Sequence, residues 1–392
     1  FLNTFNLKKK YIVFYCISFA TLCYPVSGTP FAYIHSYIFS LISLMVLILA
    51  IKNNKKIIWL AFPFFCLLSF LSMQTPSAYI LIILLFVLSY YFISTKDYKN
   101  LNYFISGGVI SIFLFFIFLF LTKTPFLNFV YQYILFPLSI GEGRISSSDV
   151  AYVSLVDQIN FKRLFGDFKF IHLLFLPLLF ISIKNFKKNK KDLNILNLTF
   201  IFSVFAFLFN QLLTANQIFI FSLIPITAAI IHINLQELNY NPKFLFLILF
   251  IVFFATVKFH IRYNVDRKFH DLENVDKSLA VNASAIHSNL KGLKWINKFD
   301  APENEVSFLK EAIEIIQNDK RKKTLITHYQ FIATVLDEDL NILNRWYLWD
   351  NNTHPTESHK YFNFYQKMVN KNIKQNNVEV IYLLGLENEI LF

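Results

Sequence analysis

Long apolar segments dominate the first 260 residues of the chain and limit what it can fold into. Measured against the roughly 20 residues that a helix needs to cross a bilayer, about nine such segments are present. They cover approximately residues 11–26, 31–51, 57–73, 77–94, 102–122, 169–183, 193–213, 217–235 and 242–260. A helix that is apolar on every side is buried in other helices or in lipid. The sequence therefore predicts a polytopic α-helical membrane protein with about nine transmembrane helices.

The composition agrees with this class and excludes others. Hydrophobic residues make up 55% of the chain and charged residues 16%, whereas soluble domains carry about 25% charged residues. The three cysteines exclude a disulfide-rich secreted scaffold and leave no cysteine-based zinc motif. The formal net charge is +12. The excess of lysine and arginine lies in short runs between the apolar segments. This distribution argues against a nucleic acid partner and is typical of a membrane protein.

Four lysine clusters predict the orientation in the membrane. They are Lys8–Lys10, then Lys52 with Lys55 and Lys56, then Lys96 with Lys99, and finally Lys184 with Lys187, Lys188, Lys190 and Lys191. With nine spans these clusters fall on one side, and lysine and arginine concentrate on the cytoplasmic side. The opposite side then receives the segments 26–30, 74–76, 122–168 and 214–216 and everything after residue 260. We therefore expect a transmembrane domain, 1–260, with an outer loop at 122–168, and a C-terminal α/β extramembrane domain, 261–392.

The C-terminal part has the pattern of a small α/β domain. A proline and an acidic residue at Pro302–Glu303 predict a helix start, and apolar residues follow at helical spacing up to Ile316. A second amphipathic helix is expected at about 357–370. The segments 324–327 and 378–384 are typical of strands, and such alternation favours a partly parallel sheet. Residues 261–392 contain no glycine-rich phosphate loop, no metal-spaced His/Asp set and no Ser-His-Asp arrangement.

Polar residues gather in the segments expected on the outer side. They are His35, Gln74, Glu142, Arg144, Asn216 and Gln217. An ionisable or polar group at membrane depth is costly unless it faces a cavity or a partner. These residues are therefore candidates for a polar cavity that opens outward. For Glu142 and Arg144 a solvated loop is an equally simple interpretation.

Four sequence features together resemble the GT-C superfamily of integral-membrane glycosyltransferases. They are a Pro-Phe-x-x-x-His-Ser stretch at 30–36, a Ser-Met-Gln-Thr-Pro-Ser stretch at 72–77, an aromatic amphipathic segment followed by Glu142 and Arg144, and Asn216-Gln217 ahead of Pro225. The C-terminal α/β domain also fits this resemblance. The bacterial protein O-mannosyltransferases and the lipid A aminoarabinose transferases are the most similar branches.

The resemblance implies an enzyme of the bacterial inner membrane, with its C-terminal domain in the periplasm. Such an enzyme moves a sugar from a polyprenyl-phosphate donor, with inversion, to an acceptor at the outer face. Inversion requires a carboxylate base and groups that hold the leaving phosphate. Arg144 is then expected to bind the phosphate. Gln74, Glu142, Asn216 and Gln217 are expected to bind the donor phosphate or sugar, and His35 to orient a substrate.

Two departures from the family pattern concern catalysis. The family's catalytic acid lies in its first outer loop, and this chain has no acidic residue before Asp97. Together with the initial Phe1, this predicts that an N-terminal segment holding the general base is missing. The family also often carries an acid near the position of Tyr33 and a lysine near that of Met73. We therefore expect that the chain on its own lacks the catalytic acidic loop.

The acceptor, the cofactor and the class of protein stay open at this point. The acceptor is a glycan, a lipid or a protein, and membrane lipid is a further partner. No metal-ligand set is visible in the sequence, although a missing loop leaves room for a divalent cation. Two other functions remain: a transporter or flippase for a lipid-linked saccharide, and a non-catalytic membrane scaffold. A transporter predicts inverted repeats and polar residues in the middle of several spans, and a scaffold predicts polar residues that share no cavity.

Overall fold

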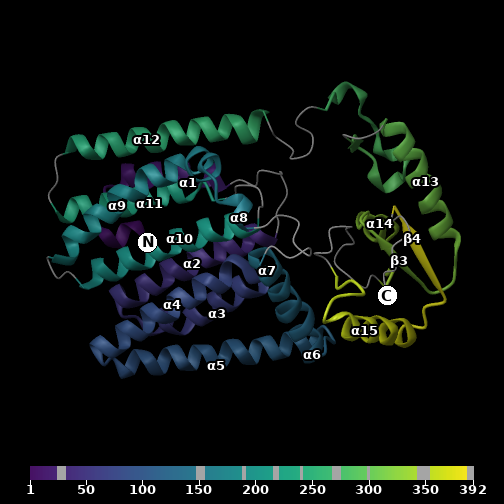
Figure 1. Cartoon of the computed structure of the whole chain (residues 1–392), viewed down its shortest axis with the longest axis horizontal. Helices are drawn as coiled ribbons and strands as arrows, with labels where there is room; N and C mark the ends of the chain where they lie inside the picture. Colours follow the sequence, from purple (N-terminus) through teal and green to yellow (C-terminus); the bar gives the residue numbers. More distant parts are fainter. Residues whose placement is uncertain are drawn as a thin grey trace. The chain divides into compact units, whose positions relative to one another are not determined.

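A computed structural model describes residues 1–23, 32–146, 155–187, 191–214, 220–238, 242–266, 275–297, 301–341 and 354–385. Helices make up most of this part of the chain (Figure 1). The chain divides into two compact units. Unit 1 consists of Phe1–Pro125 and Val153–His270, and unit 2 consists of Phe126–Tyr152 and Asp271–Phe392.

Unit 1 is a bundle of helices. They are α1 (Lys9–Cys23), α2 (Ala32–Asn53), α3 (Lys56–Ser72), α4 (Gln74–Thr95), α5 (Tyr98–Leu121), the short α8 (Leu155–Gln158), α9 (Lys169–Lys187), α10 (Lys191–Thr214), α11 (Leu223–Glu237) and α12 (Pro242–His260). Each apolar segment of the sequence overlaps one of the longer helices. Local chemistry sets some of the boundaries. The Asp97 carboxylate, for example, accepts the Asn100 backbone N–H (3.2 Å) and so caps the start of α5.

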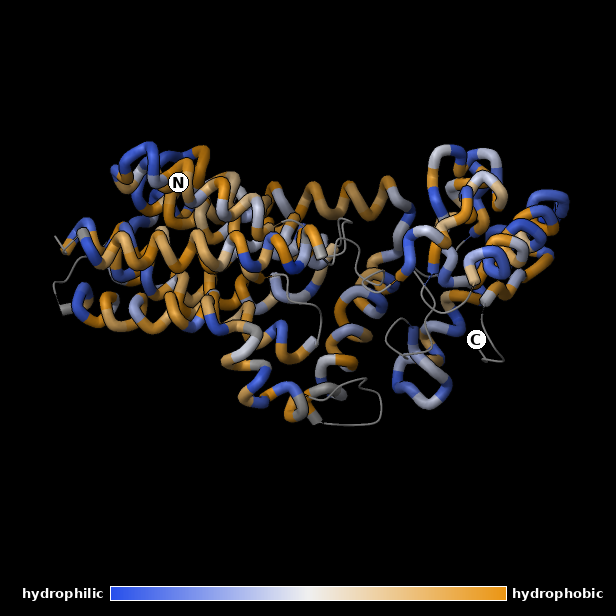
Figure 2. The backbone as a smooth tube through the Cα atoms, turned by 90° about the horizontal axis from the view of Figure 1, so that it is seen from above, coloured by the Kyte–Doolittle hydropathy of each residue, from blue (hydrophilic) through white to orange (hydrophobic). Residues whose placement is uncertain are grey.

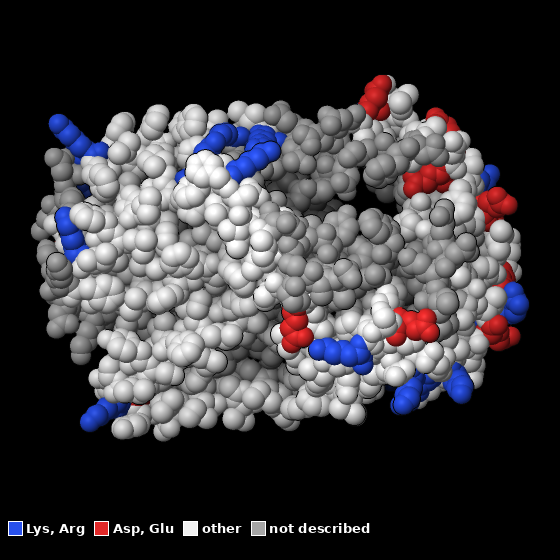
Figure 3. Space-filling model, in the orientation of Figure 1, with Lys and Arg blue, Asp and Glu red and all other residues white. Residues whose placement is uncertain are grey.

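Six helices within the described residues are long and apolar enough to cross a membrane. They are Ala32–Asn53, Gln74–Thr95, Tyr98–Leu121, Lys169–Phe186, Leu193–Thr214 and Lys243–Tyr263. Large apolar side chains of these helices lie on the surface of the unit, and Phe120 on α5 is 82% exposed. Hydrophobic residues run along the helices in Figure 2, and in Figure 3 most of the described surface of unit 1 on the face shown carries neither basic nor acidic side chains. The chain is therefore a polytopic helical membrane protein.

The other three apolar segments form shorter helices. Helix α3 has 17 residues, and α1 and α11 have 15 each. Helix α11 is buried at every position from Leu223 to Leu235, so it forms part of the interior of the bundle. The count of nine spans stays a prediction, because only six described helices meet the length and composition of a span.

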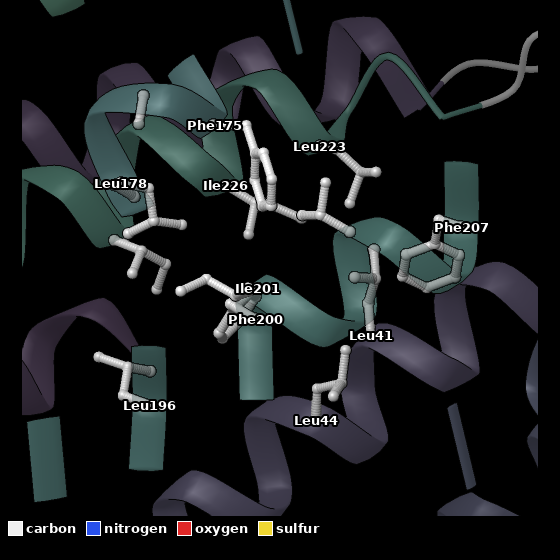
Figure 4. Close-up of a cluster of buried hydrophobic side chains, with 14 of the residues drawn as sticks. Leu41, Leu44, Phe175, Leu178, Leu196, Phe200, Ile201, Phe207, Leu223 and Ile226 are labelled. Carbon is white, nitrogen blue, oxygen red and sulfur yellow. The ribbon is translucent and has the colours of Figure 1, made fainter. Parts of the chain in front are cut away.

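The core of unit 1 lies where α2, α9, α10 and α11 meet. Side chains from all four helices interlock there, as Figure 4 shows for Leu44, Leu178, Phe200 and Ile226 among others. Helix α2 packs against α3 and α4, and α3 packs against α5. Helix α2 also contacts α10, and a hydrogen bond between Asn210 and Tyr33 places the start of α2 beside the end of α10.

Unit 2 contains the elements expected of a small α/β domain. Its helices are α6 (Phe126–Phe129), α7 (Phe136–Ser146), α13 (Pro302–Asn318), α14 (Phe331–Leu336) and α15 (Phe362–Gln375). Strand β1 (Val281–Asn282) pairs antiparallel with β2 (Lys294–Trp295), and β3 (Lys323–Thr327) pairs parallel with β4 (Val380–Leu384). The predicted helix start at Pro302 and the predicted parallel pairing are confirmed. The second helix begins later than expected, at Phe362, because residues 356–362 first form turns closed by backbone hydrogen bonds.

The segment Phe126–Ser146 belongs to unit 2, although it precedes the last membrane helices in the chain. The sequence had predicted that this segment lies in the outer loop 122–168 of the transmembrane domain. The physical reason for the difference is aromatic packing. The Tyr131 ring stacks on Phe364 of α15, with ring centroids 3.7 Å apart, and Phe136 packs edge-on against His359.

His359 connects α7 to the turn before α15 through two hydrogen bonds. Its Nδ1 accepts the Tyr361 backbone N–H (3.1 Å), which leaves Nε2–H to donate to the Ser139 hydroxyl (3.0 Å). Ser139 in turn donates to the Phe136 carbonyl oxygen (2.6 Å). This arrangement uses the neutral imidazole. Burial, and then the nearby charge of Lys360, lower the pKa of His359 below its ordinary value of 6.5.

Acidification is therefore expected to loosen the contact between α7 and His359. Because the folded state disfavours the protonated imidazole, this stabilisation is fully present above pH 6.5 and is lost as the pH falls through the lower folded pKa. Hydrogen exchange of the amides of 136–146, normalised to the intrinsic rate at each pH, should accelerate at low pH. In His359→Asn the amide oxygen still accepts the Tyr361 N–H but does not titrate, so the acceleration should disappear. An unchanged pH dependence in this variant would assign the effect to another group.

Candidate functional site

The first turns of α2 present a polar face inside an otherwise apolar bundle. Tyr33, Ser36, Tyr37 and Ser40 are spaced at i, i+3, i+4 and i+7, so they share one side of the helix. All four are buried. Polar groups buried in a membrane protein need hydrogen-bond partners. The helices packed against this face of α2 therefore have to supply them.

Tyr33 meets two amides from the end of α10. The Asn210 side-chain N–H₂ donates to the Tyr33 hydroxyl oxygen (3.1 Å), and the Gln211 side-chain N–H₂ donates to the same oxygen. Asn210 and Gln211 are completely buried, and Tyr33 is 4% exposed. Among the described residues, the side-chain carbonyl oxygens of Asn210 and Gln211 have no hydrogen-bond partner.

Ser36 joins α2 to the junction between α3 and α4. Its hydroxyl donates to the Met73 carbonyl oxygen (3.0 Å), which also accepts the Ser77 hydroxyl (2.6 Å). One turn further along α2, the hydroxyls of Ser40 and Ser69 are hydrogen-bonded (2.7 Å). The segment 72–77 is thus held against the polar face of α2.

Tyr37 contacts the residue just before α11. Its hydroxyl lies 2.7 Å from that of Ser222, and both residues are buried. We call this polar face of α2 and its side-chain partners the Tyr33 cluster: Tyr33, Ser36, Tyr37, Asn210, Gln211 and Ser222. They come from the start of α2, the end of α10 and the residue just before α11.

The sequence-predicted site residues fall into three groups. Gln74 is half-buried and directly follows Met73, so it lies beside the Tyr33 cluster. His35 is exposed, and helical geometry places it on the side of α2 opposite Tyr33 and Tyr37. It is therefore not part of the cluster.

The remaining predicted residues are outside unit 1 or outside the described residues. Glu142 belongs to unit 2, where it is exposed and forms an ion pair with Lys360 (3.2 Å). Arg144 lies in α7, but its side chain is outside the described residues. Asn216 and Gln217 are also outside the described residues, within the segment that joins α10 to α11.

Asn210 and Gln211 were not among the site residues predicted from the sequence. Both lie in the apolar segment 193–213, where they were counted as part of a span. The available signal was the pair of adjacent amides near the end of that segment, because polar residues inside spans usually face the bundle interior. Tyr33 had been noted only as a departure from the family pattern.

The Tyr33 cluster is built for hydrogen bonding rather than for proton transfer. Its side chains are neutral hydroxyls and amides, and none is a carboxylate or an imidazole. A buried acceptor without a partner costs about 1–3 kcal/mol. The amide oxygens of Asn210 and Gln211 are therefore the acceptors in this cluster that a bound hydroxyl group would satisfy.

A second amide cluster occupies the other end of α10. Asn197 and Asn234 exchange two hydrogen bonds of 2.8 Å, and Asn185 donates to the Asn234 oxygen. All three residues are completely buried. Asn197 and Asn210 are 13 positions apart on one helix, a rise of roughly 20 Å. This cluster connects α9, α10 and α11 and supplies a matched control for the Tyr33 cluster.

The described residues hold no group of three or more His, Cys, Asp and Glu residues suited to a metal ion. Comparison with family models, with curated proteins and with solved structures found no match to the chain. The resemblance to membrane glycosyltransferases therefore stays a prediction, and the function has to be argued from the geometry of the Tyr33 cluster.

Proposed function

We propose that the chain is the membrane part of a GT-C-type glycosyltransferase in the bacterial inner membrane. In this proposal it has nine spans and carries residues 261–392 on the periplasmic side. It takes a sugar from a polyprenyl-phosphate donor and transfers it, with inversion, to a glycan, lipid or protein acceptor. The Tyr33 cluster and Gln74 bind the sugar or the phosphate of the donor.

The observation that carries the proposal is the meeting of two motif segments at one end of the bundle. Residues 32–36 begin α2, and the stretch 72–77 joins α3 to α4. These two segments are far apart in the sequence. A hydrogen bond nevertheless connects Ser36 to Met73, and another connects Tyr33 to Asn210 near the end of α10. Two of the motifs on which the resemblance rests therefore border the same buried polar groups.

The location of the Tyr33 cluster, at one end of the helix bundle, suits a lipid-linked donor. The isoprenoid chain of such a donor lies in the bilayer, while its phosphate and sugar lie at the surface, where spanning helices end. Side-chain amides hydrogen-bond sugar hydroxyls and phosphate oxygens equally well. The cluster has no carboxylate, so it supports binding and orientation. The general base has to come from the acidic loop that the resemblance implies, and Arg144 is the proposed partner of the leaving phosphate.

Donor binding, rather than turnover, tests this proposal. The full chain would be reconstituted in lipid nanodiscs, and binding of a tritiated polyprenyl-phosphate hexose would be measured. Combining Asn210→Leu with Gln211→Leu removes both free acceptors at nearly constant volume, and we expect the Kd to rise about tenfold or more, equivalent to about 1.4 kcal/mol. Asn197→Leu makes the same kind of change in the second amide cluster of α10 and should leave the Kd within about twofold. Thermal melting of each variant would show that it is folded.

Two results would contradict the proposal. If Asn197→Leu raised the Kd as much as the double variant, the effect would come from a disturbed bundle and not from the Tyr33 cluster. If the unmodified chain did not bind the donor, the non-catalytic scaffold would be favoured. Transbilayer movement of the lipid-linked sugar in vesicles would favour the transporter.

A further inference from the structure

Three cations gather at one end of unit 1. Lys169 is the first residue of α9, Lys258 lies in the last turn of α12, and Arg262 lies four positions further on, in the turn that continues α12. The Nζ atoms of Lys258 and Lys169 lie 5.5 Å and 5.8 Å from the centroid of the same ring, that of Phe170. In Figure 3 basic side chains gather in the upper part of unit 1, near the end of α12. We call Lys169, Lys258 and Arg262 the cation cluster.

Like charges meet in the cation cluster. The half-buried Lys258 side chain is in direct contact with that of Lys169, and the other charged group that acts on it is Arg262. Among the described residues, no ion pair joins these three cations to an acid. The side chains of Asp167 and Asp266, the acids closest in sequence, are outside that part of the chain. Because cations held together repel one another, the cluster is complementary to an anion.

Packed aromatic rings support the cation cluster from below. Phe170 packs edge-on against Phe259, with ring centroids 5.6 Å apart, and Phe259 stacks on Phe221 at 3.8 Å. The guanidinium carbon of Arg262 lies 5.3 Å from the centroid of the Tyr263 ring. Phe221, Phe259 and Tyr263 are buried. Such ring faces attract cations, so the three charges are held together by the packing of α9 and α12.

The cation cluster lies where two candidate spans reach the membrane surface. These spans are Lys169–Phe186, which begins at the cluster, and Lys243–Tyr263, which ends at it. Phe221 directly precedes Ser222, which is hydrogen-bonded to Tyr37, so the Tyr33 cluster lies at the same end of unit 1. In the orientation expected from the sequence this end is outside the cytoplasm. The bias that concentrates lysine and arginine in cytoplasmic loops therefore does not account for the cluster.

We infer that the cation cluster binds a phosphomonoester group at the membrane surface. Arg262 can donate two parallel hydrogen bonds to phosphate oxygens, and the two lysine ammonium groups can donate to the others. A phosphomonoester carries about two negative charges at neutral pH, and a phosphodiester carries about one, so the monoester offsets more of the positive charge. Basic pockets between membrane helices commonly hold lipid headgroups. This inference does not depend on the proposed glycosyl transfer.

Native mass spectrometry of the full chain in detergent tests the inference, because it counts bound lipids. We expect phosphatidic acid, a lipid phosphomonoester, to bind about tenfold more tightly than phosphatidylglycerol, a phosphodiester. The variant with glutamine at all three positions of the cation cluster should lose this preference. The control variant removes the same charge at the end of unit 1 opposite the Tyr33 cluster, with glutamine in place of the exposed Lys52, Lys55 and Lys56. Its preference should stay within about twofold of that of the unmodified chain.

Two further measurements identify the source of the phosphate and exclude misfolding. Displacement of phosphatidic acid by an equal concentration of inorganic phosphate would identify a free phosphate as the ligand, whereas retention of the lipid would identify a headgroup. Combining Lys169→Arg with Lys258→Arg keeps the charge and should keep the preference, and thermal melting would show that each variant is folded. Equal binding of the two lipids by the unmodified chain would overturn the inference. Equal loss in the control variant would also overturn it, because any group of surface charges would then suffice.

Discussion

Replacing Gly107 by alanine is expected to destabilise unit 1 by about 1–3 kcal/mol or more. Helix α5 crosses α3 at this glycine, and a methyl group there would lie 2.9 Å from the Leu60 carbonyl carbon and Cα. Backbone atoms cannot turn aside as a side chain can, so the two helices would have to separate. Separation would also weaken the packing of Phe62 on Phe104, whose ring centroids are 5.9 Å apart. Small residues commonly permit such close approach between membrane helices.

The neighbouring glycine provides the control. A methyl group at Gly108 would meet nothing within 4 Å. Because alanine favours helix over glycine by up to about 1 kcal/mol, Gly108→Ala should be neutral or slightly stabilising. Thermal melting of both variants in the same detergent, followed by size-exclusion chromatography, compares them directly. Equal melting temperatures would show that α3 and α5 do not cross at Gly107.

Replacing Leu309 by alanine is expected to destabilise unit 2 by about 2–5 kcal/mol. Leu309 is completely buried on α13, in a core that it shares with Ile313, Leu325 and Ile332. Truncation leaves a cavity between α13 and the β3–β4 pair, since a close-packed core relaxes only in part. The loss of stability should accelerate hydrogen exchange of the β3 amides, because all five residues of that strand are buried.

Phe308 is the matched control for Leu309. It is the preceding residue on α13 but is 44% exposed. Phe308→Ala removes more apolar atoms than Leu309→Ala, yet surface substitutions usually change stability by no more than about 0.5 kcal/mol. Exchange of the β3 amides should therefore stay close to that of the unmodified chain. Comparable acceleration in both variants would mean that α13 does not form this core with β3.

Local patterns predicted many of the elements correctly. The apolar segments are helices, the helix at Pro302 begins where a proline and an acid predicted it, and β3 pairs parallel with β4. The helices depend on neighbours in the sequence, whereas the β3–β4 pairing joins segments that are 57 positions apart, from Lys323 to Val380. The start of α15 was placed too early, because turns around His359 come first.

The candidate site was predicted only in part. Gln74 lies beside the Tyr33 cluster, whereas His35 does not. Asn210 and Gln211 were overlooked, because hydropathy averaged over a span hides two amides among apolar neighbours. Which side of a helix faces its partners depends on packing, and hydropathy does not report it.

The sequence by itself determined that the chain is a helical membrane protein. In lipid, every backbone N–H and C=O has to be satisfied within the segment, so long apolar segments become helices whatever surrounds them. Only the tertiary structure decided which helices are neighbours. It placed Tyr33 against Asn210, 177 positions away, and it joined Phe126–Tyr152 to the C-terminal unit. Both outcomes depend on side chains finding partners across the fold, and the spacing of residues along the chain carries no information about those partners.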